Sequence, residues 1–289
     1  MQRTEVVWAV TAWYADHARD LPWRAADATP WGIMVSEFML QQTPVARVLE
    51  PWRRWLERWP TPAALAAEEP GEAVRAWGRL GYPRRALRLH AAATAIVRDH
   101  GGEVPRELDA LRALPGVGEY TAAAIASFAF GQRHAVLDTN VRRVLARLVA
   151  GRAAPAHSLT RAERELAESW LPDDPATAAR WAVAAMELGA QLCTAATPDC
   201  EACPVAAHCR WLASGRPANA PPRRTQAYTG TDRQARGALL AVLREAAATV
   251  AREELLAAWP IDPDQAGRAL DSLTADGLVR EATPDLFRL

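Results

Sequence analysis

The cysteines of this chain stand together in one short stretch and could act as metal ligands. They are the only cysteines in the sequence, and their spacing is C-x6-C-x2-C-x5-C: Cys193, Cys200, Cys203 and Cys209. Four thiolates in one loop can hold a four-iron four-sulfur (4Fe-4S) cluster, whereas structural zinc usually binds two close-spaced pairs, and only one such pair is present. Two disulfides are a third interpretation, which a long chain without a secretory leader disfavours. The spacing therefore favours the cluster.

Glu37 is a single acidic residue within an otherwise apolar run, Ile33-Met-Val-Ser-Glu-Phe-Met-Leu40. A charge in such a run is unfavourable unless the side chain is used or paired. If Glu37 is half-buried, its pKa rises and it can serve as a general acid near neutral pH. The alternative is that Glu37 lies on the one exposed face of its helix.

A second carboxylate, Asp138, stands at the start of a predicted helix. Aspartate at this position caps a helix by accepting backbone hydrogen bonds, and it stays ionised and can also face a cleft. We expect the arginines of this helix to face solvent. Its buried stripe is expected to consist of apolar residues three and four positions apart: Val141, Val144, Leu145 and Leu148.

The segment LPGVG, residues 114–118, lies between a predicted helix ending near Ala113 and an apolar helix over 120–130. Its residues Gly116, Val117 and Gly118 allow a tight turn that points backbone N–H groups outward at a helix start. Such a turn can bind one DNA phosphate, because the N–H groups and the helix dipole both favour negative charge. Taken alone, the same segment is also a common turn between helices.

The charged residues exclude one kind of chemistry and favour one part of the chain for binding. All 34 basic residues are arginines, so the Met1 amine is the only primary amine available for a Schiff base. The formal net charge is zero, but residues 232–289 hold seven arginines and ten acids, which leaves 27 arginines and 24 acids before them. The front part is therefore favoured for contact with phosphates.

Apolar residues recur at three- and four-residue steps almost throughout, which predicts an all-α protein made of short helices. Residues 215–231, rich in proline, glycine and arginine, read as a linker. Beyond it, helices near 233–247, 252–258 and 264–275 and a short β-like tail predict a small winged-helix-like module.

No long apolar run suggests a leader or membrane span, so we expect a soluble, cytoplasmic protein. The spacing of Trp52, Trp55 and Trp59 predicts a packed helix face.

A series of short segments occurs in one order over roughly residues 5 to 215. These segments are Leu21-Pro-Trp-Arg24, Val35-Ser-Glu-Phe-Met-Leu-Gln-Gln-Thr43, Leu80-Gly-Tyr82, Leu89-His90, Leu114-Pro-Gly-Val-Gly118 with Tyr120-Thr121, Leu137-Asp-Thr-Asn-Val-Arg142, Met186-Glu-Leu-Gly-Ala190 and the cysteine loop. On these residues the chain resembles the MutY family of adenine DNA glycosylases, which belongs to the helix-hairpin-helix superfamily that includes endonuclease III. The stretch S-E-x-M-L-Q-Q-T distinguishes this family from its relatives.

The resemblance implies a helix-hairpin-helix DNA glycosylase fold and a base excision repair activity. The enzyme would flip adenine opposite 8-oxoguanine or guanine out of double-stranded DNA and excise it. We expect a monomer associated with the nucleoid. The implied domains are an iron-sulfur cluster domain, a six-helix barrel domain, a linker and the winged-helix-like module: 1–24 with 131–215, 25–130, 216–231 and 232–289.

The resemblance also implies roles for single residues. Glu37 would protonate adenine N7, and Asp138 would stabilise the oxocarbenium-like sugar electrostatically or covalently, as in two-carboxylate glycosidases. Tyr120 and Asn140 would support Asp138, and Tyr120 occupies the place of the Schiff-base lysine of bifunctional relatives. The remaining matches are to residues that line the base pocket, enter the gap at the lesion or form the hairpin: Trp23, Arg24, Gln42, Gly116, Val117 and Gly118.

Two departures from the family pattern concern recognition of the opposite base. Many relatives carry a MutT-like C-terminal domain that senses 8-oxoguanine, and this chain has only the short module. The second tyrosine of the family's G-L-G-Y-Y is Pro83, so the intercalating aromatic wedge is expected to be missing at that position. Another residue would have to hold the 8-oxoguanine side.

Three alternatives to adenine excision follow from the residues. A thymine-specific mismatch (T opposite G) glycosylase of the same superfamily is the nearest, although thymine has no N7 for Glu37 to protonate. A non-catalytic cluster protein that binds damaged DNA would not need both carboxylates. A bifunctional glycosylase-lyase would have to use the Met1 amine.

Overall fold

The computed structural model describes residues 3–218 and 228–289, and these residues are mostly helical, as the sequence predicts. Part of the predicted linker, residues 219–227, lies outside the described residues. Within the described part, no helix is both long and apolar enough to cross a membrane. The chain divides into two compact units. The predicted domain boundaries stay a prediction.

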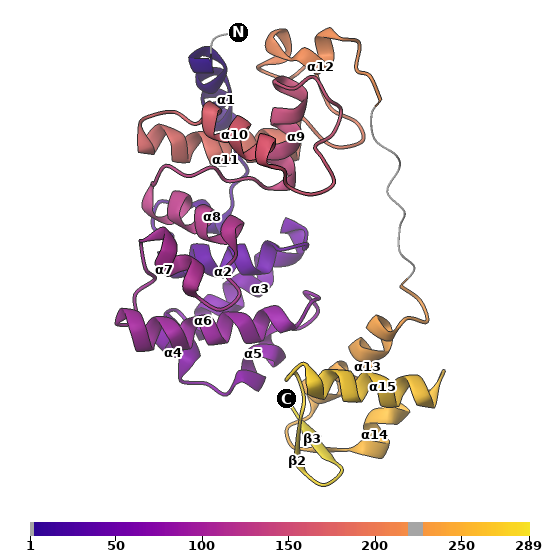
Figure 1. Ribbon diagram of the computed structural model, residues 1–289. Helices are drawn as coiled ribbons and strands as arrows, with labels where there is room; N and C mark the ends of the chain where they lie inside the picture. Colours follow the sequence, from indigo (N-terminus) through magenta and orange to yellow (C-terminus); the bar gives the residue numbers. More distant parts are fainter. Residues whose placement is uncertain (1–2, 219–227) are drawn as a thin grey trace. The chain divides into compact units, whose positions relative to one another are not determined.

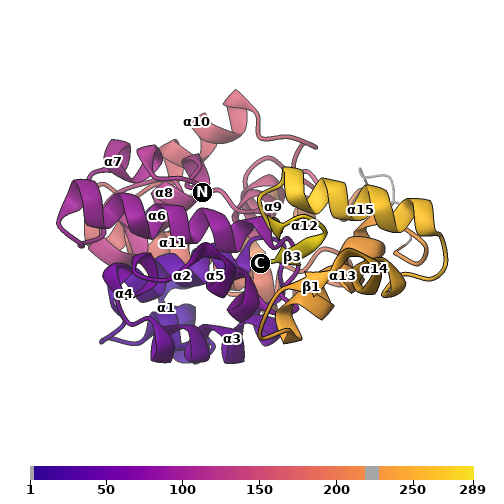
Figure 2. The same cartoon turned by 90° about the horizontal axis from the view of Figure 1, so that it is seen from below.

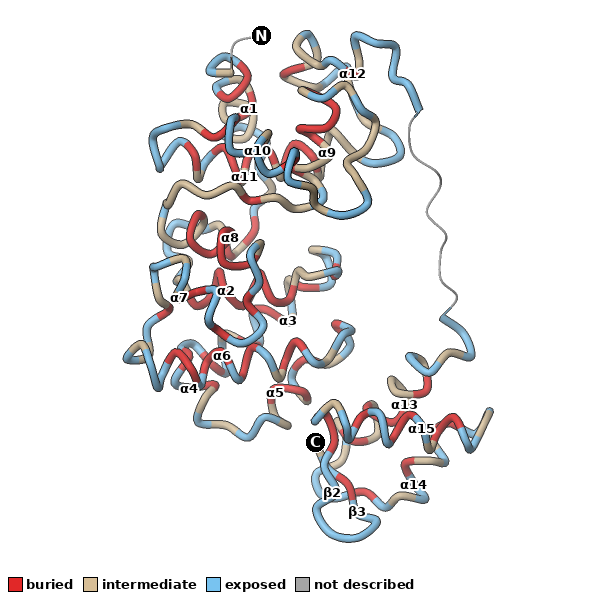
Figure 3. The backbone as a smooth tube through the Cα atoms, in the orientation of Figure 1, coloured by how far each residue is buried: buried red, intermediate tan, exposed pale blue. Residues whose placement is uncertain are grey.

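The first unit comprises the described residues of 1–37, 105–113 and 117–222. Figure 1 shows its N-terminal helix gathered with helices from the later part of the unit, and Figure 3 shows buried segments along them. Each of these helices contributes apolar residues to a shared core, which includes Val10, Val144 and Leu188. The helices of this unit are α1 (Arg3–His17), η1 (Pro22–Arg24), α2 (Pro30–Leu40), which continues into the second unit, α7 (Leu108–Ala113), α8 (Glu119–Phe130), α9 (Thr139–Leu148), α10 (Arg161–Trp170), α11 (Pro175–Gln191), η2 (Ala206–His208) and α12 (Arg210–Ala213).

Side-chain caps explain where the helices of the first unit begin. Asp138, Thr160 and Asp174 each accept a hydrogen bond from a backbone N–H in the first turn of the helix that follows. Thr160 and Glu163 form a reciprocal capping box at α10. The predicted N-cap role of Asp138 is confirmed, as is the buried stripe of α9.

The second unit comprises the described residues of 38–104, 114–116 and 223–289. The predicted tryptophan face is confirmed, because Trp52, Trp55 and Trp59 on and after α3 are all buried. The rings of Trp55 and Trp59 meet edge to face at 4.7 Å between centroids. The helices of its first part are α3 (Val45–Arg58), α4 (Pro62–Ala66), α5 (Pro70–Trp77) and α6 (Arg84–His100).

The C-terminal module has three helices and a three-stranded antiparallel sheet, with strand order β1-β3-β2. Its helix bounds agree with the predicted ones to within two residues, and Figure 2 shows its helices beside the sheet. The helices bury leucines at helical spacing, among them Leu239, Leu255 and Leu270. The elements are α13 (Asp232–Glu245), β1 (Val250–Ala251), α14 (Arg252–Ala257), α15 (Pro263–Ala275), β2 (Arg280–Thr283) and β3 (Leu286–Arg288).

Candidate active site

Glu37 lies in the last turn of α2, between apolar neighbours, with only 6% of its surface exposed. Burial, together with the charge of Asp138, raises the pKa of its carboxyl to about 7. A hydrogen bond from the Tyr120 hydroxyl and the charge of Arg24 oppose this rise. The predicted burial is confirmed, and the alternative of an exposed helix face is wrong. Near neutral pH, Glu37 is therefore a carboxylic acid with a proton to give.

Tyr120 is hydrogen-bonded to Glu37 and lies near Asp138. It is the second residue of α8, directly after the hairpin segment, and its hydroxyl donates to Glu37. Burial, together with the negative charges of Glu37 and Asp138, raises the pKa of the phenol well above its usual range. Tyr120 therefore stays protonated and acts as a fixed donor to Glu37, whereas its predicted support of Asp138 stays a prediction.

Both oxygens of Asp138 accept hydrogen bonds from α9. Oδ1 accepts from the Val141 backbone N–H at 2.6 Å, and Oδ2 accepts from Asn140 Nδ2 at 2.7 Å. Burial raises the pKa of the Asp138 carboxyl above its ordinary value, and these hydrogen bonds and the charge of Arg143 oppose the rise. The contacts thus support the ionised form, which can stabilise a positive sugar, against the effect of burial.

Arg143 connects Asn140 to the cysteine loop. Its Nη2 donates to Asn140 Oδ1 at 2.8 Å and to the Gly189 carbonyl at 2.6 Å, and its Nε donates to the Cys193 carbonyl at 2.7 Å. Gly189 allows this close approach of α11 to α9, because a Cβ there would lie 2.7 Å from Asn140 Cβ. A chain of hydrogen bonds therefore runs from Asp138 to the first cysteine.

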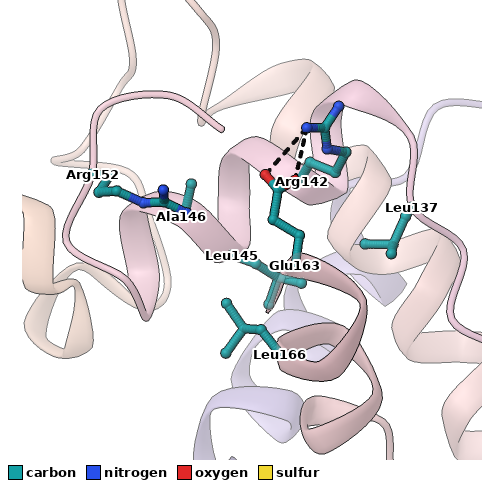
Figure 4. Close-up of a pocket in the computed structure, with 7 residues that line it drawn as sticks. All are labelled: Leu137, Arg142, Leu145, Ala146, Arg152, Glu163 and Leu166. Carbon is teal, nitrogen blue, oxygen red and sulfur yellow. Dashed lines mark hydrogen bonds and ion pairs between the residues drawn. The ribbon is translucent and has the colours of Figure 1, made fainter. Parts of the chain in front are cut away.

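The expectation that the arginines of α9 face solvent is wrong. The Arg142 side chain is 11% exposed and donates to Glu163 Oε2 at 2.9 Å, beside a small pocket whose lining includes Leu145 and Leu166 (Figure 4). Arg147 is 4% exposed and donates to carbonyls of the cysteine loop, including Thr194 at 2.7 Å. The arginines point inward because loops that return over α9 present backbone carbonyls that need donors.

All four cysteines are free and half-buried, so the disulfide interpretation is not supported by the structure. Burial and the negative charges of the other three sulfurs raise the pKa of the Cys203 thiol to about 11. Arg147 Nη1 lies 3.4 Å from Cys193 Sγ. Among the described residues, no three histidine, cysteine or acidic side chains lie close enough together to hold a metal ion. The four cysteines are therefore candidate cluster ligands because they are thiols in one shared loop. The distances between their side chains do not themselves show a metal site.

Arg24 joins the site to a residue whose role the sequence did not reveal, Glu187 of α11. Arg24 Nη2 donates to Glu187 Oε2 at 2.9 Å, and Arg19 Nε donates to Oε1 at 2.6 Å. Burial raises the pKa of Glu187, but these hydrogen bonds outweigh it and lower the pKa to about 2. Arg24 Nη1 is buried without a hydrogen-bond partner among the described residues. Trp23, next to Arg24 in η1, is buried as well.

The hairpin segment has the predicted form, since α7 ends at Ala113 and α8 begins at Glu119. Gly116 has a φ of 79°, and a Cβ there would lie 2.7 Å from Arg88 Cβ, so this position requires glycine. Val117 is buried, and Gly118 is the N-cap of α8.

Gln42 is exposed, in a turn of the second unit. One residue before Pro83, Tyr82 is 50% exposed, an aromatic ring that the sequence pattern matched but to which it gave no role. The position of this tyrosine between a glycine and a proline was the sequence signal that could have indicated an exposed ring in a turn. The structure thus brings Glu37, Tyr120, Asp138, Asn140 and Arg24 into one network in the first unit, whereas Gln42 and Gly116 belong to the second.

Comparison with known proteins identifies the class. Residues 35–171 match the model of the HhH-GPD superfamily base excision DNA repair proteins. A solved structure of a thermostable thymine-DNA glycosylase has a TM-score of 0.65 and 27% identity, covering 73% of this chain and 97% of its own. The helix-hairpin-helix glycosylase fold predicted from the sequence is confirmed.

Two bacterial relatives identify the family within this class. The adenine DNA glycosylase of Mycobacterium tuberculosis is 55% identical over 96% of this chain and 91% of its own length. That of Mycolicibacterium smegmatis is 52% identical, over 96% of this chain and 94% of its own. The chain belongs to the adenine DNA glycosylase family.

Proposed function

We propose that this protein is a monofunctional adenine DNA glycosylase that removes adenine opposite 8-oxoguanine or guanine in double-stranded DNA. The observation that carries the proposal is the buried Glu37, whose pKa is about 7 and which lies near Tyr120 and Asp138. One carboxyl that holds a proton and a second carboxyl whose ionised form accepts hydrogen bonds are what acid-assisted hydrolysis of an N-glycosidic bond needs.

Glu37 gives its proton to adenine N7. Protonation makes adenine a neutral leaving group, and the N-glycosidic bond then breaks with its electron pair passing to the base. Tyr120 holds Glu37 by its hydroxyl, which stays protonated throughout. Thymine has no N7, so this proton transfer requires a purine.

Asp138 stabilises the positive charge that develops on the sugar as the bond breaks. Its oxygens are held by Val141 and Asn140, so the carboxylate does not have to reorganise during the reaction. Water then adds to the sugar to complete the hydrolysis. Trp23 and Arg24 line the base pocket, where the unpaired Nη1 of Arg24 is a donor available to the base.

The chain cuts only the base from the strand. Tyr120 stands where a bifunctional relative would need lysine, and the sequence has no lysine at all, so no side chain can form a Schiff base with the abasic sugar. Strand breaks are expected only after treatment with alkali.

The remaining contacts serve binding. The hairpin at Gly116–Gly118 binds one DNA phosphate through backbone N–H groups, and Gln42 enters the gap at the lesion. The exposed Tyr82 takes the wedge role expected to be missing at Pro83. Cys193, Cys200, Cys203 and Cys209 would hold a 4Fe-4S cluster, which when bound fixes their loop in place. The enzyme acts as a monomer in the cytoplasm, on the DNA of the nucleoid.

The test is single-turnover excision on four duplexes: A opposite 8-oxoguanine, A opposite G, T opposite G and A opposite T. Each reaction is developed with and without alkali. Breaks on the first two duplexes, seen only after alkali, support the proposal. Cleavage confined to T opposite G would transfer the function to the thymine-specific alternative, and tight binding without any cleavage would indicate a non-catalytic sensor.

A further inference from the structure

Two turns of the second unit hold exposed side chains on an unusual backbone. Gln42, after the end of α2, has a φ of 56°, and Tyr82, before the start of α6, has a φ of 47°. This left-handed region is unfavourable for residues other than glycine unless the surroundings hold it in place. Both side chains are exposed to solvent. Something must therefore stabilise both turns.

One buried guanidinium contacts both turns. Arg85 is 4% exposed, and its Nη1 donates to the carbonyl of Gln41 at 2.6 Å. Its Nη2 donates to Thr43 Oγ1 at 2.9 Å and to the Gly81 carbonyl at 3.0 Å. The acceptors from the first turn flank Gln42, and the acceptor from the second turn precedes Tyr82. The same Nη1 also donates to carbonyls at the end of α2, those of Phe38 and Met39.

No carboxylate of the described residues forms an ion pair with Arg85. Its hydrogen-bond partners among the described residues are carbonyls and one hydroxyl, and burial lowers the pKa of the guanidinium to about 10. The rings of Trp77 and Tyr82 lie 5.1 Å and 5.6 Å from its central carbon. A buried charge without a carboxylate partner is energetically costly. The planar guanidinium of Arg85 donates to several acceptors in fixed directions, which the single ammonium group of lysine could not do in the same way.

We propose that Arg85 is a positioning residue that locks Gln42 and Tyr82 into a preformed pair, ready to enter the DNA duplex at the mismatch. This inference rests on the proposed function for its substrate. A side chain that fills the stack after a base leaves must be ordered when the complex forms. If the turn is already fixed, little conformational entropy is lost at that moment. Arg85 therefore favours binding to a mismatch, where bases are displaced, over binding to an undamaged duplex.

The test compares affinities of the full chain for two duplexes. One carries adenine opposite 8-oxoguanine, with a 2′-fluorine on the adenosine sugar to slow cleavage, and the other is undamaged. Arg85→Lys should weaken mismatch binding about tenfold and leave affinity for the undamaged duplex within about twofold. Arg58→Lys is the matched control, because Arg58 is an ion-paired surface arginine of the same unit. It should change neither affinity.

Coupling separates positioning from general damage to the fold. In a Gln42→Ala, Tyr82→Ala background, Arg85→Lys should weaken mismatch binding by no more than about twofold, because the side chains that it positions are gone. An equal loss in both backgrounds, or an equal loss on the undamaged duplex, would overturn the proposal. If Arg85→Lys does not fold, Thr43→Val, which removes one acceptor, should give a smaller loss with the same coupling.

A failure of the proposed function and a failure of the Arg85 proposal would appear in different measurements. Wild-type excision of adenine tests the function, whereas the ratio of mismatch to undamaged affinity tests Arg85. If the wild type excises only thymine opposite G, the same comparison is made on that duplex. A coupled loss there would still support the positioning role of Arg85, and an uncoupled loss would overturn it.

Discussion

Glu37 and Glu187 are both buried glutamates within apolar helices, but their carboxyl groups have opposite acidities. The pKa of Glu37 is raised to about 7, and that of Glu187 is lowered to about 2. Glu37 accepts from a neutral phenol, whereas Glu187 accepts from the guanidinium groups of Arg19 and Arg24. Burial raises both pKa values, so the partners decide the outcome. One helix carries a proton donor, and the other carries an anchor for arginines.

Removing the proton of Glu37 should have the largest effect. Glu37→Gln keeps the shape of the side chain but has no acidic proton, so single-turnover excision of adenine opposite 8-oxoguanine should fall about a thousandfold. Glu165→Gln, at an exposed acid of α10, is the control and should retain full activity. A fall of less than about tenfold would show that another group protonates the base.

Glu187→Gln should affect the fold more than the chemistry. The substitution leaves the positive charges of Arg19 and Arg24 without their carboxylate, and removing one partner of a buried pair costs about 3 kcal/mol. Urea denaturation monitored by tryptophan fluorescence measures this loss. The freed charge of Arg24 should also lower the pKa of Glu37. An unchanged unfolding midpoint would mean that Glu187 is not the anchor.

The two glutamates should give pH dependences of opposite sign. Excision should fall about tenfold per pH unit above a pH of about 7, as Glu37 loses its proton.

Folding stability should depend on pH as well. Because the pKa of Glu37 is raised on folding, Glu37 adds stability below its unfolded-state pKa of 4.5, and this stability is lost as pH rises through about 7. The lowered pKa of Glu187 adds stability above 4.5, and this is lost as pH falls through about 2. A pH–rate profile with pH-dependent denaturation tests both signs, and a rate still rising at pH 9 would contradict the role of Glu37.

Asn140→Ala should have the smallest effect. The loss of its hydrogen bond to Asp138 removes a contact that favours the ionised carboxylate, so the pKa of Asp138 should rise. The acid limb of the excision profile should move to higher pH, with a rate loss of about fivefold at neutral pH. Thr139→Ala, at the exposed neighbouring position, is the control. An unmoved acid limb would show that Val141 alone holds Asp138.

Local signals predicted many elements of the fold and part of the site. The cap at Asp138, the tryptophan face of α3 and the helices of the C-terminal module all follow from residues within one or two helical turns of each other. Glu37 could be singled out because a lone acid in an apolar run is informative by itself. Glu187 carries a similar signal in Met186-Glu-Leu-Gly-Ala190, but its role depends on arginines about 165 positions away along the chain.

The inward arginines show why local patterns were insufficient. Arg142, Arg143 and Arg147 occupy helix positions that look polar, and the sequence alone suggests solvent exposure. Each donates instead to carbonyls of a loop that returns from elsewhere in the chain. Helical periodicity reports which side of a helix is apolar, but it does not report where an unpaired carbonyl will lie.

The amino-acid sequence by itself determined the helical elements, the family and the absence of any lysine for lyase chemistry, because these depend on composition and short-range pattern. Only the tertiary structure decided which buried charges keep a proton, which are paired and which turns are held in a left-handed conformation. Acidity and backbone strain depend on the nearest donors and acceptors, and for Glu37, Glu187 and Arg85 these come from distant parts of the chain.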